Sequence, residues 1–60
     1  MKTVCRGFTY NHACYILEMR KDKYPVTDTK QFGQWTGFYD KDGRLLARYH
    51  EGTGKLQVAD

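Results

Sequence analysis

Four side chains whose nitrogen or sulfur atoms could bind a metal ion are spread along the sequence: Cys5, His12, Cys14 and His50. They are enough in number for a zinc ion, which takes four ligands. However, structural zinc sites usually bring two thiolates together through a short Cys-x₂₋₄-Cys turn, and the sequence has no such turn. We therefore expect no metal and no other cofactor, and we interpret both cysteines as small buried thiols of a protein in a reducing compartment.

The same thiols and imidazoles are the candidates for covalent catalysis. Cys14 lies two residues after His12, but no third group beside them would orient the imidazole. Asp40 and Asp42 belong to an Asp-Lys-Asp-Gly stretch, where aspartates usually bond to the local backbone of a turn. The stretch 52–55, Gly-Thr-Gly-Lys, lacks the first glycine and the Ser or Thr of a phosphate-binding loop. We expect a protein that is not an enzyme and has no small-molecule substrate.

Length and composition favour one small domain, residues 1–60. A chain of this size buries roughly 60% of the surface that it exposes when unfolded. No stretch approaches the roughly 18 apolar residues that span a bilayer, and the first residues lack the apolar core of a signal peptide. We expect a cytoplasmic protein without a membrane partner. The net charge of +3 permits contact with a polyanion but does not require it.

Residues 32–59 predict a three-stranded antiparallel meander, with Asp-Gly and Gly-Thr-Gly turns between the strands. If Phe38 faces Leu45 and Tyr49 faces Leu56, alternate side chains sort into two faces. The apolar face is expected to contain Phe38, Leu45, Ala47, Tyr49, Leu56 and Val58. The opposite face is expected to contain Trp35, Tyr39, Arg44, Leu46, Arg48, His50, Lys55 and Gln57.

The first half of the chain is compatible with two structures. A hairpin over residues 3–21, with Tyr10 opposite Tyr15, places most apolar side chains on one face. A helix over about 12–24, with Asn11 as its N-cap and Pro25 beyond its end, is the alternative. Residues 22–31 are interpreted as a loop. The hairpin plus the meander predict a mainly β domain, a small five-stranded antiparallel barrel; the helix predicts an α+β fold on an antiparallel sheet.

The face opposite the apolar one carries the remaining chemical signal. Its candidate binding residues are Trp35, Tyr39, Arg44, Leu46, Arg48 and Lys55. Aromatic rings stack on bases, and arginine and lysine neutralise phosphates. We therefore expect a small recognition module that binds nucleic acid through this face. The alternative is a protein-binding adaptor, or an inhibitor of a host enzyme or assembly, that uses the same aromatic patch around Leu46.

Overall fold

The helix of the computed structural model, which describes residues 1–59, is α1 (Tyr10–Met19). Thr9 is its N-cap, because the backbone there is extended and the hydroxyl accepts a hydrogen bond from the His12 N–H at 3.2 Å. The spacing of four residues between Ala13 and Leu17 brings both side chains to one side of the helix, where they are buried. The helical alternative is therefore confirmed, although α1 begins at Tyr10 rather than residue 12 and ends at Met19 rather than residue 24.

The predicted hairpin over residues 3–21 is wrong. It relied on the alternation of apolar side chains at positions 15, 17 and 19, which is typical of a strand. In the helix only Leu17 of these three is buried, whereas Tyr15 and Met19 are 60% and 68% exposed. Two large apolar residues on the surface therefore produced the misleading pattern.

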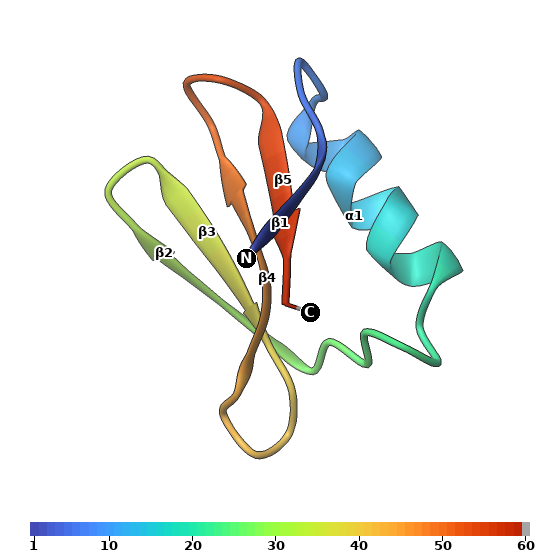
Figure 1. Cartoon of the computed structure of the whole chain (residues 1–60). Helices are drawn as coiled ribbons and strands as arrows, with labels where there is room; N and C mark the ends of the chain where they lie inside the picture. The colour runs from blue at the N-terminus through green and yellow to red at the C-terminus, as the bar shows by residue number, and fades with distance from the viewer. Residues whose placement is uncertain (60) are drawn as a thin grey trace.

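In the described part of the chain, five antiparallel strands form one sheet, which confirms the predicted mainly β character of the fold (Figure 1). They are β1 (Lys2–Cys5), β2 (Asp28–Phe32), β3 (Trp35–Tyr39), β4 (Leu45–His50) and β5 (Lys55–Val58). Their order in space is β1-β5-β4-β3-β2, so β1 and β2 are the two edges. Because these edges are not paired with each other, the sheet is open, and the predicted closure into a barrel is wrong. The helix lies on one side of the sheet instead, in an α+β arrangement.

Strand β2 begins in the segment 22–31, for which the sequence predicts a loop, and ends one residue beyond it at Phe32. All five of its residues are exposed, and each pairs with a residue of β3 across the short turn at Gly33 and Gln34. Gly33 adopts a φ of 62°, which glycine reaches without the strain that a side chain would cause. A strand that is exposed on both faces has no alternation of apolar and polar residues, so the sequence pattern did not reveal it.

The register of the meander is partly as predicted. Tyr49 pairs with Leu56 and His50 with Lys55, as expected for the hairpin of β4 and β5. In the hairpin of β3 and β4, Phe38 pairs with Ala47 and not with Leu45. This shift of two residues leaves Phe38 on the predicted face, because side chains alternate with a period of two.

A bulge in β4 exchanges the expected positions of two leucines. The register between β3 and β4 shifts after Phe38, so that Tyr39 pairs with Leu45. The side chain of Leu46 consequently packs against the hydrophobic core, where Leu45 was expected. The predicted position of Leu46 on the opposite face is wrong.

The core lies between α1 and the sheet, as the closeness of the two in Figure 1 indicates. Its buried side chains are Ala13, Leu17, Tyr24, Phe38, Ala47, Tyr49, Leu56 and Val58. The hydroxyl of Tyr49 donates a hydrogen bond to the Phe8 carbonyl at 2.5 Å, which ties the segment before α1 to the sheet. Cys5 and Cys14 are free thiols, half-buried at the margin of this core, and burial raises the pKa of the Cys5 thiol.

Candidate functional site: the open face of the sheet

The side of the sheet that faces away from α1 is here called the open face. Phe38, Ala47, Tyr49 and Leu56 turn towards α1. Except at the bulge, where Leu46 also packs against the core, the residues next to them along each strand therefore turn to the open face. The aromatic, basic and polar side chains of the open face are Thr3, Lys30, Phe32, Trp35, Tyr39, Arg48, His50, Lys55 and Gln57. All five strands, including both edges of the sheet, therefore contribute to one surface.

Trp35 and Arg48 form the closest aromatic and cationic contact of the open face. The central guanidinium carbon of Arg48 lies 4.2 Å from the centroid of the Trp35 ring. The ring of His50, which is paired with Trp35 across β3 and β4, meets the indole edge to face at 4.6 Å. Such a stack holds a cation against an aromatic ring and limits the rotamers of both side chains.

Hydrogen bonds continue from Arg48 across the sheet to the other edge. Nε of Arg48 donates to Oε1 of Gln57 at 2.8 Å, and Nε2 of Gln57 donates to the Thr3 hydroxyl at 3.3 Å. These three residues are also register partners in neighbouring strands. Because only Nε of Arg48 is used in this bond, its two terminal nitrogen atoms can donate to an external acceptor. The guanidinium is thus positioned by Trp35 on one side and by Gln57 on the other.

A second aromatic and cationic pair lies on the β2 side of the open face. A Cβ atom added to Gly37 would lie 2.8 Å from Cε1 and from the hydroxyl of Tyr39, so the Tyr39 ring covers the backbone of this glycine. Nζ of Lys30 lies 5.4 Å from the centroid of the same ring. Gly37 pairs with Lys30 of β2 on one side and with Arg48 of β4 on the other. The absence of a side chain at Gly37 therefore makes room for the Tyr39 ring between the two cations.

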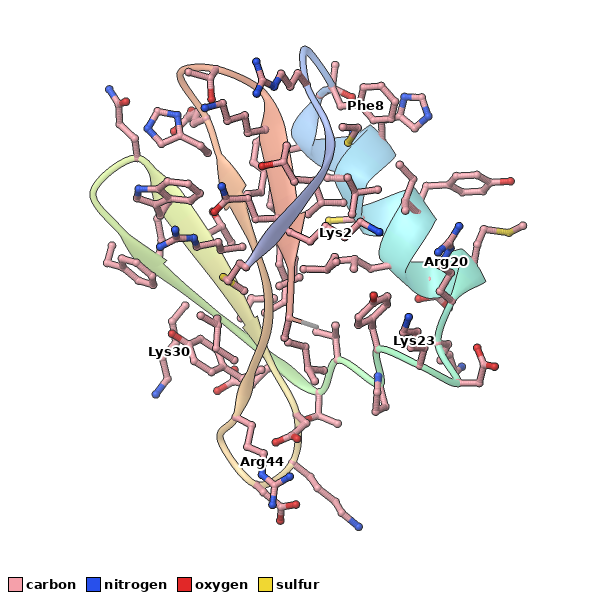
Figure 2. The ribbon with its side chains drawn as sticks, in the orientation of Figure 1. Lys2, Phe8, Arg20, Lys23, Lys30 and Arg44 are labelled. Carbon is pink, nitrogen blue, oxygen red and sulfur yellow. The ribbon has the colours of Figure 1, made fainter. Side chains whose placement is uncertain are left out.

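The open face carries an excess of positive charge. Among residues 1–59, its basic residues are Lys30, Arg48 and Lys55, and Asp28, which pairs with Tyr39, is the acidic residue at its edge. In Figure 2 the labelled side chain of Lys30 extends away from the side of the sheet that α1 covers. Phe32, at the end of β2, is 46% exposed and adds a large uncovered aromatic ring. The face therefore combines flat aromatic surface with cations over a solvent-accessible sheet.

The structure brings together four of the six predicted binding residues: Trp35, Tyr39, Arg48 and Lys55. Lys30 and Phe32 also belong to the open face but were missed, because they were assigned to a loop and to the margin of a strand. The sequence signal for this hairpin is the pair of aromatic residues Phe32 and Trp35, which are separated by two residues that include Gly33. The structure pairs these two aromatic residues across the turn.

Arg44 is not part of the open-face cluster. It lies in the turn between β3 and β4, at the end of the hairpin opposite Trp35, as its label in Figure 2 indicates. Its backbone N–H donates to Oδ1 of Asp40 at 2.9 Å, and the Asp42 N–H donates to the same atom at 2.8 Å. These backbone donors hold the pKa of the Asp40 carboxyl below its usual value, and the Arg44 N–H has the largest effect. Asp40 and Arg44 therefore organise a turn.

The residues considered for a metal ion lie apart. His12 stacks on Phe8 with ring centroids 4.2 Å apart, near the start of α1, whereas His50 belongs to the open face. Within residues 1–59, no group of three or more His, Cys, Asp or Glu side chains is placed to share a metal ion.

A hollow of about 400 Å³ lies on the other side of the sheet, between α1 and the segment that leads to β2. Leu17, Tyr24, Val26 and Phe38 provide apolar walls. Cys14 also lines the hollow and interacts with the Tyr10 hydroxyl. Burial is the main cause of the raised pKa of the Tyr10 phenol, and the contact with Cys14 raises this pKa further. Because the sheet separates it from the open face, this hollow does not contribute to the candidate site.

Comparison with known protein families, with curated proteins and with solved structures found no match to this chain. In the part of the chain that the structure describes, α1 is too short to cross a membrane, and no other helix has the length and apolar character to do so.

Proposed function

We propose that this protein is a small, non-enzymatic binding module whose open face binds single-stranded nucleic acid. The observation that carries the proposal is the cluster of Trp35, Arg48, Tyr39 and Lys30, in which two aromatic rings and two cations lie together on an uncovered sheet. Unstacked bases offer flat faces to such rings, and their phosphates attract the cations. A single strand exposes both at once, whereas a duplex hides its base faces.

The geometry of Arg48 supports phosphate contact. Its guanidinium is held against Trp35, and Nε is held by Gln57. The Arg48 side chain is therefore already ordered when a phosphate approaches its terminal nitrogen atoms. This lowers the entropic cost of binding. Arginine also offers paired N–H groups that suit phosphate oxygens.

A protein partner is the competing possibility for the same surface. The patch proposed for it was centred on Leu46, and this side chain packs against the core. The surface that remains is basic and aromatic, which favours a polyanion. We also propose a cytoplasmic location, because the free thiols Cys5 and Cys14 are typical of a reducing compartment.

Fluorescence anisotropy with generic single-stranded and double-stranded oligonucleotides tests the proposal. We expect binding at low salt that weakens steeply as salt rises, because counterions are released when phosphates are neutralised. Arg48→Gln is expected to weaken binding to single strands about tenfold and to lower the salt slope by about one. Arg44→Gln is the matched control, since it removes the same charge from a turn outside the open face.

Two results would contradict nucleic-acid binding. One is an absence of binding to any oligonucleotide at low salt. The other is an equal effect of Arg48→Gln and Arg44→Gln, which would show that overall charge rather than the open face is responsible. Binding of a protein from the native cell that persists after nuclease treatment and changes little with salt would favour the protein partner instead.

A further inference from the structure

The free edge of β2 differs from the free edge of β1. All five residues of β2 pair with β3 in continuous register, and all are exposed. The pairing of β1 with β5 shifts between Thr3 and Cys5, and such a bulge disturbs an edge and hinders further strand pairing. Figure 1 shows β2 as the last strand of the sheet, on the side remote from α1. The regular edge of β2 is therefore the one suited to accept another strand.

The hydrogen bonds of Thr29 show which backbone groups face this edge. Its N–H donates to Oδ1 of Asp28 at 2.9 Å instead of to β3, so it is directed away from β3. In an antiparallel strand the N–H and C=O groups of one residue point to the same side, and this direction repeats every second residue. The backbone groups of Thr29 and Gln31 consequently lie at the free edge, where an added strand would find them.

We propose that a second copy of this chain pairs with β2 in an antiparallel manner, about a two-fold axis at Thr29. In this register Asp28 of each copy lies opposite Lys30 of the other, and both side chains belong to the open face. Shifting the axis to Lys30 would instead place two lysines opposite each other. Because Asp28 and Lys30 carry opposite charges on either side of Thr29, an axis at Thr29 places opposite charges against each other. The two-fold symmetry makes this Asp28–Lys30 pair occur twice.

Pairing exchanges contacts that the single chain makes within itself. The Asp28 carboxylate gives up the Thr29 N–H, which then donates to the Thr29 carbonyl of the second copy. Lys30 turns from the Tyr39 ring towards Asp28 of the second copy. The two five-stranded sheets join edge to edge, and their open faces form one continuous surface. The association itself requires no nucleic acid, although it engages Lys30, which also belongs to the proposed binding cluster.

Sedimentation measurements without nucleic acid test the proposal. The contact is small, so we expect the apparent mass to rise towards twice that of one chain between about 10 μM and about 1 mM. Asp28→Lys and Lys30→Asp should each abolish this rise, because they place like charges opposite each other. The double variant Asp28→Lys with Lys30→Asp restores opposite charges and should restore the dimer.

Lys23→Asp is the control for net charge. Lys23 is exposed and lies beside an aromatic ring, as Lys30 does, but Figure 2 shows these two labelled lysines on opposite sides of the molecule. The Lys23→Asp variant should dimerise as the unchanged chain does. Circular dichroism verifies that every variant is folded. A chain that stays monomeric over the whole range would overturn the proposal. A dimer that survives both single substitutions, or that the double variant fails to restore, would also overturn this register.

Discussion

Glycines at two turns show how the surroundings of one residue set its effect on stability. Gly43 and Gly54 both have positive φ, at 80° and 67°, which disfavours any side chain. A Cβ at Gly43 would meet nothing within 4 Å, whereas at Gly54 it would lie 2.8 Å from the backbone N and O atoms of Phe8. The Gly54 turn approaches the Phe8 segment this closely because the Phe8 N–H donates to the Gly54 carbonyl at 3.1 Å.

We therefore predict that Gly54→Ala costs clearly more stability than Gly43→Ala. The backbone conformation alone accounts for about 1 kcal/mol at either position, and the contact with Phe8 adds to it only at Gly54. For a domain with roughly 3–5 kcal/mol of net stability, Gly54→Ala should leave a measurable unfolded population. Urea unfolding of both variants gives the comparison, and equal midpoints would show that the close approach is absent.

Asp40 provides a prediction of pH dependence. Its lowered pKa means that the ionised form is stabilised in the folded protein, chiefly by the Arg44 N–H. This contribution to stability is present above the ordinary aspartate pKa of about 3.9 and is lost as the pH falls through the lower folded value. Asp40→Asn should therefore flatten part of the fall in melting temperature between about pH 5 and pH 2. An identical acid profile for both proteins would contradict this role.

At the scale of elements, Thr9 is the N-cap that starts α1, whereas the sequence pattern predicts another residue for this role. Thr9 accepts the His12 N–H, whereas Asn11, the predicted N-cap, lies inside the helix. We predict that Thr9→Ala lowers stability by about 1 kcal/mol and that Thr9→Ser is close to neutral. Asn11→Ala is the control and should cost less than Thr9→Ala. Thermal unfolding of the three variants decides between the two positions.

The sequence was sufficient for elements whose two faces differ. Tyr49 and Leu56 fall on the buried face at alternate positions, and their pairing follows from this. It was insufficient for β2, which is exposed throughout, and for the bulge in β4, since Leu45 and Leu46 are both apolar and either could turn inwards. The site reflects the same division: Trp35, Arg48 and Lys55 were found, and Lys30 was missed together with its strand.

At the scale of the whole molecule, the helix and the open face divide the sheet between two roles. Packing of α1 buries one side, and the other side is left to display Trp35, Tyr39, Arg48 and Lys30. Gly37 is the point at which fold and site meet, because its lack of a side chain lets Tyr39 lie across the sheet. The proposed binding thus uses a surface that is not needed to hold the core together.

Gly37→Ala tests this link. A Cβ there meets only the flexible end of the Tyr39 ring, so we predict a small loss of stability, below about 1 kcal/mol, and a displaced ring. Binding to a single-stranded oligonucleotide should weaken several-fold, because one stacking surface moves. Anisotropy and urea unfolding on the same variant separate the two effects. Unchanged affinity with a displaced ring would remove Tyr39 from the binding surface.

The most direct test of the central claim is an NMR titration of the labelled protein with a generic single-stranded oligonucleotide at low salt. The proposal predicts that the Trp35 indole N–H and the Arg48 guanidinium N–H signals shift most, together with backbone amides of β3 and β4. Signals of Tyr15 and Met19, on the exposed side of α1, should stay in place. Shifts that gather on α1, or no shifts at all, would contradict a nucleic-acid-binding open face.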